Sequence, residues 1–276
     1  MTTPEVHRPH PEAPARALLR ASEDGSAWPG ARADRFEVVS RGDFVPGRLH
    51  RPGASEDAAL PLLLLVHDGG DDMRAGMDAD ALAFHGDWVR QGLAVATIDL
   101  PLHGERASPK LSERLGHGLA RLGQGESLDP ETWALVQEFA RQSTSDLIRT
   151  LDALAALPDI DAERLAFMGI GAGATTGTYL LAHDARVRAA VLAFVRGGGR
   201  GSRELDPALH LARSRAASLL LLHGAADDPA ERKAAQACFD AAPEPKQQRA
   251  VQGRGSALAA EDRVAIWDFL SDALQA

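Results

Sequence analysis

Apolar and polar positions along the chain follow two alternating periods, and these periods predict strands separated by helices. Residues 62–66 are continuously apolar, which is typical of a strand covered on both faces in a parallel sheet. The stretch 145–157 instead places Leu147, Leu151 and Leu154 on one face of a predicted helix. The same alternation continues toward the C-terminus. It predicts βαβ units, and therefore an α/β fold with a mainly parallel central sheet and helices on both faces.

The remaining predicted elements fall into a regular series. Extended patterns predict a hairpin over 35–52 and single strands over 92–100, 164–170, 187–195, 217–224 and 246–253. Helical patterns cover 76–91, about 172–183, 206–215, 229–240 and a final segment that carries Val264, Trp267, Leu270 and Leu274. Residues 1–33 contain five prolines and are predicted to form an N-terminal arm, in which 15–21 could make a short helix. Residues 34–276 are predicted to form a single domain.

Composition and charge exclude several classes of protein. The chain has 276 residues, of which 45% are apolar, so it can bury a full core. No apolar stretch is long enough for a membrane span and no leader pattern opens the chain, so we expect a cytoplasmic protein that does not contact a membrane. The net charge of −9 and the low aromatic content exclude a typical nucleic-acid binder. The single cysteine, Cys238, is expected to pack in the core. The sequence is compatible with a homo-oligomer.

Short polar and glycine-containing motifs follow the predicted strands, where ligand sites of parallel sheets lie. In chain order they are "HDGG" (67–70), "DLPLHGER" (99–106), "GIGAG" (169–173), "HGAADDP" (223–229) and "GRG" (253–255). Taken in this order, from about residue 35 to the C-terminus, the motifs resemble those of the α/β-hydrolase family. The resemblance is closest to the dienelactone hydrolase and acetyl-esterase-like branch, and it implies the α/β-hydrolase fold.

The nucleophile position is the first departure from the family pattern. In the family, a G-x-S-x-G elbow holds the nucleophile on a tight turn from a strand into a helix. Gly169 and Gly173 match the two flanking glycines, and Gly171 stands where the nucleophile belongs. Since glycine has no side chain, no acyl-enzyme can form at this position.

The other two triad positions are implied by the same resemblance. Asp227 matches the acid, with Asp228 as the adjacent candidate, and Arg254 matches the histidine. Arginine stays protonated in proteins and cannot act as a general base. The resemblance therefore implies a non-hydrolytic relative that binds a small carbonyl-containing or acyl ligand, or a protein partner. The alternative is an esterase or lyase that uses other residues.

Several residues are expected to shape the ligand pocket. The turn at Asp68 and Gly69 and the start of a helix near Ala172 would present backbone N–H groups to it. The family usually has glycine in place of Asp68, whose charge would favour neutral carbonyl compounds. His117 lies in the polar segment 107–131, which is either a lid insertion or an ordinary surface helix.

A second alternative is a nucleotide-binding protein. Gly169, Gly171 and Ala174 also satisfy the dinucleotide pattern G-x-G-x-x-G/A. The acidic partner expected about twenty residues later is replaced by Arg196, and this interpretation leaves the other strand-end motifs unexplained. We therefore expect no cofactor. No metal site is expected either, because the pair His7 and His10 has no further ligand nearby in the sequence.

Overall fold

The strands form one mixed sheet. The computed structural model describes residues 15–21, 30–53, 59–70, 73, 86–196, 203–227, 229–252 and 258–275. Within these ranges, nine strands pair in the order β1-β2-β3-β5-β4-β6-β7-β8-β9. They are β1 (Leu18–Ala21), β2 (Ala31–Ser40), β3 (Asp43–Pro52), β4 (Leu60–Val66), β5 (Ala94–Ile98), β6 (Ile160–Ile170), β7 (Val187–Ala193), β8 (Ser218–Gly224) and β9 (Lys246–Val251). The pairs formed by β1, β2 and β3 are antiparallel, and all the others are parallel, which confirms a mainly parallel sheet.

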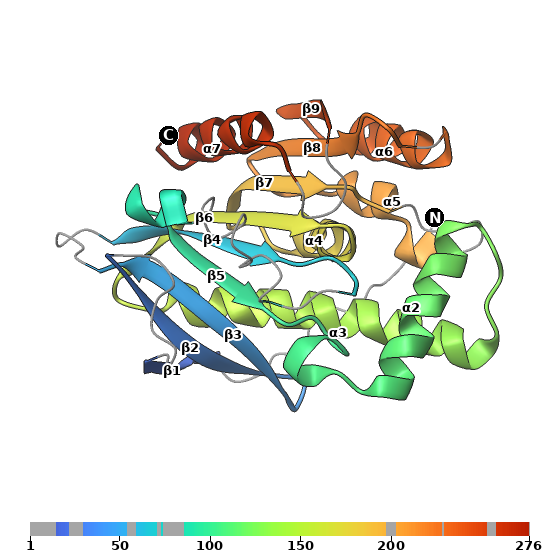
Figure 1. The fold of residues 1–276 in the computed structure, drawn as a ribbon, viewed down its shortest axis with the longest axis horizontal. Helices are drawn as coiled ribbons and strands as arrows, with labels where there is room; N and C mark the ends of the chain where they lie inside the picture. Colours follow the sequence, from blue (N-terminus) through green and yellow to red (C-terminus); the bar gives the residue numbers. More distant parts are fainter. Residues whose placement is uncertain are drawn as a thin grey trace.

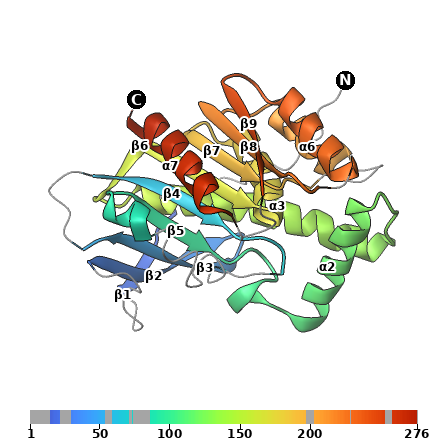
Figure 2. The same ribbon diagram turned by 45° about the horizontal axis from the view of Figure 1, so that its top comes forward.

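Helices lie on both faces of this sheet. They are α2 (Pro109–Gly123), α3 (Pro130–Ala155), α4 (Ala172–His183), α5 (Pro207–Leu211), α6 (Pro229–Ala241) and α7 (Ala260–Gln275). Figures 1 and 2 show α7 on one face of the sheet and α3 on the other. No helix in the described ranges combines the length and apolar character that a membrane crossing requires.

The continuous apolar run of β4 is explained by two separate cores. Leu62 and Leu64 are buried in the core that contains α3 and α4, whereas Leu63 and Leu65 are buried in the core that contains α7. Because successive strand residues point to opposite faces, a strand covered on both sides needs an apolar residue at every position. The predicted two-sided burial is confirmed.

The N-terminal part of the sheet contains one confirmed and one wrong prediction. The hairpin is confirmed, because β2 and β3 pair around a turn at Arg41 and Gly42. The short helix predicted within 15–21 is wrong, since β1 pairs with β2 in antiparallel register. A helix of this length is marginal without packing, whereas the edge of β2 supplies partners to the backbone groups of β1.

Candidate functional site

The turn between β6 and α4 has the geometry of a strand-to-helix elbow. Gly171 occupies it with φ of 52° and ψ of −107°, and its N–H donates to the carbonyl of Ala193 at 2.8 Å. This backbone conformation lies in the region that favours glycine. The elbow therefore keeps a backbone shape that would be strained for any other residue, and its central residue carries no reactive group.

The two flanking glycines are required by close backbone packing. A Cβ atom on Gly169 would lie 2.4 Å from the carbonyl oxygen of Gly173. A Cβ atom on Gly173 would lie 2.4 Å from the carbonyl oxygen of Val66 in β4. Both contacts are to backbone atoms, which cannot move aside as a flexible side chain can. The pattern of glycines seen in the sequence thus reflects how tightly α4 approaches the sheet.

The carboxylate of Asp68 occupies the centre of the elbow. β4 and β6 pair with Val66 opposite Gly169, which brings the residues after β4 beside the elbow. Asp68 Oδ1 accepts hydrogen bonds from the N–H of Gly69 at 2.6 Å and from the N–H of Ala172 at 2.8 Å. These are N–H groups that the sequence predicted to face a ligand. In this structure they hold a side chain of the protein instead.

The same carboxylate also fills the space above Gly171. A Cβ atom built on Gly171 would lie 1.9 Å from Asp68 Oδ1, far inside any allowed contact. Asp68 Oδ2 accepts from Arg196 Nη2 at 2.7 Å, and the Asp68 side chain is only 13% exposed. Three donors therefore converge on one carboxylate. The sequence predicted that Asp68 would repel anions, but it did not predict that Asp68 would itself take the anion's place.

His67 holds the segment that carries Asp68. Its Nδ1 lies 2.7 Å from the carbonyl oxygen of Asp68, and its Nε2 accepts from the N–H of Leu100 at 3.1 Å. The second contact requires an unprotonated Nε2, so Nδ1 carries the proton and donates to Asp68. Because both ring nitrogens are engaged, His67 positions the turn and has no free base for proton transfer.

Asp227 lies at the predicted acid position, directly after β8. Its Oδ2 accepts from the N–H of Gly224 at 2.8 Å, and the Arg232 guanidinium donates to its carbonyl oxygen. The carboxylate is thus folded back onto the end of its own strand. Arg254 and Asp228 lie outside the described residues, so the positions that the resemblance assigns to them stay predictions.

The hydroxyl groups of Thr175 and Thr176 and the thiol of Cys238 are not activated as nucleophiles. Thr175 Oγ1 donates to the carbonyl of Gly171 at 3.0 Å, and Thr176 Oγ1 donates to the carbonyl of Gly173 at 3.1 Å. Both hydroxyl protons are therefore used inside α4. Cys238 is buried in α6, as predicted, and burial raises the pKa of its thiol to about 12. A thiol with this pKa stays protonated at neutral pH and is a poor nucleophile.

An apolar cavity of about 60 Å³ lies beside the elbow. Ala172, Thr175 and Arg196 line it on the elbow side. Its other walls are mainly apolar side chains from α2, α3 and α4, among them Leu119, Leu122, Val136, Phe139 and Tyr179. Part of the segment 107–131 therefore covers the cavity as the helix α2.

His117 lies away from this cavity. It is exposed on α2 and lines a separate surface depression together with Lys110 and Arg121. Since α2 turns its buried residues Leu115 and Leu122 toward the protein, His117 is on the opposite side of the helix. Its predicted contact with a ligand has no support from this position.

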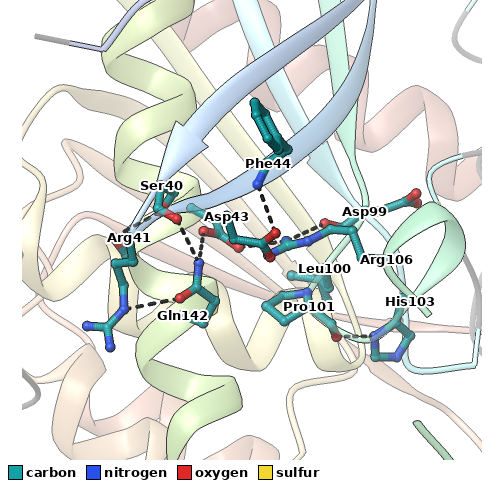
Figure 3. Close-up of polar contacts among 12 residues, drawn as sticks. Ser40, Arg41, Asp43, Phe44, Asp99, Leu100, Pro101, His103, Arg106 and Gln142 are labelled. Carbon is teal, nitrogen blue, oxygen red and sulfur yellow. Dashed lines mark hydrogen bonds and ion pairs between the residues drawn. The ribbon is translucent and has the colours of Figure 1, made fainter. Parts of the chain in front are cut away.

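The strand-end motif after β5 has a structural role. Asp99 is fully buried, and its carboxylate accepts from the N–H of Met73 at 2.7 Å and from the N–H of Glu105 at 2.8 Å. Arg106 donates to the carbonyl of Asp99 at 3.1 Å and to the carboxylate of Asp43 at 2.7 Å (Figure 3). These contacts join the loop after β5 to the turn between β2 and β3.

Arg106 also forms a buried ion pair with Asp146 in α3. The Nη1 to Oδ2 distance is 2.7 Å, and the Asp146 side chain has no exposed surface. Burial raises the pKa of Asp146 to about 6, although the Arg106 charge and hydrogen bonds from Ser40 and Gln142 oppose this shift. The pair holds α3 against the loop after β5 and the N-terminal hairpin. Its contribution to the free energy of unfolding depends on pH.

Asp146 should make the stability of the protein fall as pH rises from about 4 to about 6. In this window the folded protein keeps a proton that the unfolded chain has lost, so deprotonation favours unfolding. A rise of the pKa from 3.8 to about 6 corresponds to roughly 2–3 kcal/mol in the free energy of unfolding. Urea unfolding of the parent and of Asp146→Asn at several pH values measures this effect. The difference between the two should change with pH by this amount, and parallel pH profiles would contradict the assignment.

The chain resembles known proteins in its structure and not in its sequence. No protein-family model matches the sequence, and no curated protein matches it. Among solved structures, the acetyl xylan esterase from Paenibacillus sp. R4 superposes with a TM-score of 0.71 at 17% identity, over 95% of this chain and 90% of that chain. The chain has the α/β-hydrolase fold.

Two further structures agree with this assignment. A cold-adapted esterase from an Arctic intertidal metagenomic library matches with a TM-score of 0.69 at 18% identity, over 92% of this chain and 99% of that chain. A dienelactone hydrolase-like protein from Klebsiella pneumoniae matches with a TM-score of 0.65 at 17% identity, over 89% of this chain and 98% of that chain. The predicted resemblance to the α/β-hydrolase fold, drawn from the order of the strand-end motifs, is therefore confirmed.

The alternative sites considered from the sequence receive less support. A dinucleotide would place its pyrophosphate at the N-terminus of α4, where the Asp68 carboxylate already accepts from Ala172. Within the described residues, no group of three or more His, Cys, Asp or Glu side chains is placed to hold a metal ion. In this α/β-hydrolase fold, the elbow and the adjacent cavity remain the candidate functional site.

Proposed function

We propose that this chain is a non-hydrolytic protein of the α/β-hydrolase fold that binds a small carbonyl-containing or acyl ligand in the cavity beside the elbow. One observation carries the proposal. The Asp68 carboxylate lies 1.9 Å from the position that a side chain at residue 171 would need, and it accepts from Gly69 and Ala172. The nucleophile position and the oxyanion-binding donors are therefore filled together.

Three catalytic elements of a serine hydrolase are compromised under this proposal: the nucleophile, the base and the oxyanion donors. Gly171 supplies no nucleophile, and Arg254, at the position matched to histidine, supplies no base. Removal of the nucleophile or the base alone costs about a millionfold in turnover, and loss of one oxyanion donor costs roughly 100-fold to 1,000-fold. Hydrolysis through the usual acyl-enzyme is not expected to survive these changes.

The cavity supports a role in ligand binding. It lies next to the elbow, its lining is mainly apolar, and it contains the guanidinium of Arg196 as a polar group. An apolar cleft with few polar groups is the usual form of a small-molecule site. The similar structures include proteins named acetyl xylan esterases, which act on acyl esters, so acyl compounds are the first ligands to test.

The purified parent should not hydrolyse a panel of aryl and alkyl esters faster than a heat-denatured sample. The panel should include short acetyl and butyryl esters, with release of acid followed by pH-stat. Asp227→Ala is the matched variant, and its rate should equal that of the parent. Turnover by the parent that disappears in Asp227→Ala would show a working acid, and turnover that survives in it would show an esterase or lyase built on other residues. Either result would contradict the proposal.

A further inference from the structure

The cavity beside the elbow limits the size of its occupant. Its volume of about 60 Å³ corresponds to room for about four to six water-sized atoms, because one water occupies roughly 10–15 Å³ on this measure. Leu119 and Leu122 close it from α2, and Val136 and Phe139 close it from α3. Only a short chain fits between these walls without displacing α2.

Most polar groups that line the cavity already have partners. The hydroxyl protons of Thr175 and Thr176 are used by carbonyl groups of the elbow and α4. Tyr179 donates its hydroxyl proton to the carbonyl of Leu205 at 3.0 Å, and burial raises the pKa of Tyr179, so it stays a neutral donor. The hydroxyl groups of Thr175, Thr176 and Tyr179 therefore have no spare proton for a ligand.

Arg196 differs from these groups. It is the only charged side chain in the described lining of the cavity, and it remains 59% exposed. A guanidinium carries five N–H donors, and Nη2 alone binds Asp68 in this structure. Its other side-chain N–H groups bind no described residue, so they can donate to the oxygen of a ligand while the pair with Asp68 stays intact.

The charge of this site favours a neutral ligand. Asp68 compensates the positive charge of Arg196 at 2.7 Å, and it also accepts from the N–H at the start of α4. A ligand carboxylate would meet Asp68 as a like charge, whereas a carbonyl dipole would not. The backbone donors of Gly69 and Ala172 are not free to compensate a second negative charge.

We propose that Arg196 is the polar anchor of this cavity and that it holds the carbonyl oxygen of an uncharged short-chain acyl compound, with the chain between α2 and α3. The proposal rests on the proposed ligand-binding function and specifies its ligand class. Arg196 would replace the backbone oxyanion donors, which Asp68 occupies. The ligand is bound without any covalent step.

Butyramide is a suitable probe, and butyrate is its charged counterpart of nearly the same shape. We expect chemical-shift titrations to show saturable binding of butyramide and at least about tenfold weaker binding of butyrate, because like charges disfavour the anion. Arg196→Met should weaken butyramide binding by at least about fivefold, since the carbonyl loses its hydrogen bond. Arg196→Lys keeps a donor and the charge, and it should bind within about threefold of the parent. Arg213→Met changes an exposed arginine outside the cavity lining and serves as the control.

Leu122→Trp separates ligand binding in the cavity from the specific role of Arg196. It fills the cavity with a larger side chain and should abolish binding while thermal unfolding shows a folded protein. Binding that is lost in Leu122→Trp but unchanged in Arg196→Met would overturn the role of Arg196 and leave the proposed function standing. Butyrate binding as tightly as butyramide would overturn the neutral ligand class alone. If the parent bound neither probe, the proposed ligand-binding function would itself be contradicted.

Discussion

The double variant Gly171→Ser/Arg254→His should hydrolyse a small activated ester no faster than the parent, and adding Asp68→Gly should produce clear hydrolysis. Sequence alone predicts that the two substitutions suffice, because they restore the serine and histidine positions around Asp227. The structure changes this expectation. A side chain at residue 171 would meet Asp68 Oδ1 at 1.9 Å, so the serine would be displaced or Asp68 would be forced out of place.

Removal of the Asp68 side chain should act in two ways. It frees the volume above residue 171, and it releases the N–H of Ala172 to bind a developing oxyanion. The elbow already has φ of 52°, so the strained backbone that a nucleophile requires is in place. We expect the triple variant to exceed the parent and the double variant by at least about 100-fold, which is the effect of a single oxyanion donor.

The assay is burst and steady-state release of 4-nitrophenol from its acetate ester. The single variant Asp68→Gly is the matched control, because it opens the site without a nucleophile and should show no burst. Adding Asp227→Ala to the triple variant should remove most of the gain if Asp227 orients the new histidine. A double variant as active as the triple variant would show that Asp68 does not block the elbow.

Gly173→Ala should destabilise the protein strongly, whereas Gly116→Ala should not. A Cβ atom at residue 173 would lie 2.4 Å from the Val66 carbonyl oxygen and 2.6 Å from that of His67. Both atoms belong to backbone at the end of β4, so α4 would have to move away from the sheet. The free energy of unfolding should fall by about 2–4 kcal/mol, as for other overpacked core positions.

Gly116 is a matched control inside another helix. A Cβ atom at residue 116 in α2 would meet no atom within 4 Å, so Gly116→Ala should raise stability by up to about 1 kcal/mol through helix propensity. Urea unfolding followed by circular dichroism measures both variants. Equal stabilities of the two variants would mean that the approach of α4 to β4 is looser than the structure indicates.

Local sequence patterns predict much of this fold. The apolar run 62–66 identifies a strand buried on both faces, because successive residues of the run point into two different cores. Gly169 and Gly173 can be recognised as elbow glycines because their spacing reflects one local strand-to-helix turn. Features that depend on a few consecutive residues and a single backbone geometry are therefore accessible from the sequence.

Long-range side-chain contacts are not accessible in the same way. The sequence shows a charge at Asp68, but its binding to Ala172 and Arg196 joins residues separated by 104 and 128 positions. No local sequence pattern indicates that the Asp68 side chain turns toward the elbow. The strand β1 was missed for a related reason, since its conformation is set by pairing with β2 and not by its own helix-forming residues.

In the proposed non-hydrolytic protein, the elbow contains no nucleophile and Asp68 occupies its place. Labelling with a small fluorophosphonate, followed by intact-mass and peptide mass spectrometry, tests this proposal. The triple variant Asp68→Gly/Gly171→Ser/Arg254→His supplies the positive control, with an adduct expected at residue 171. We expect that the parent gains no mass under conditions that label the triple variant. Stoichiometric labelling of the parent at a single residue, lost when that residue is replaced, would contradict it.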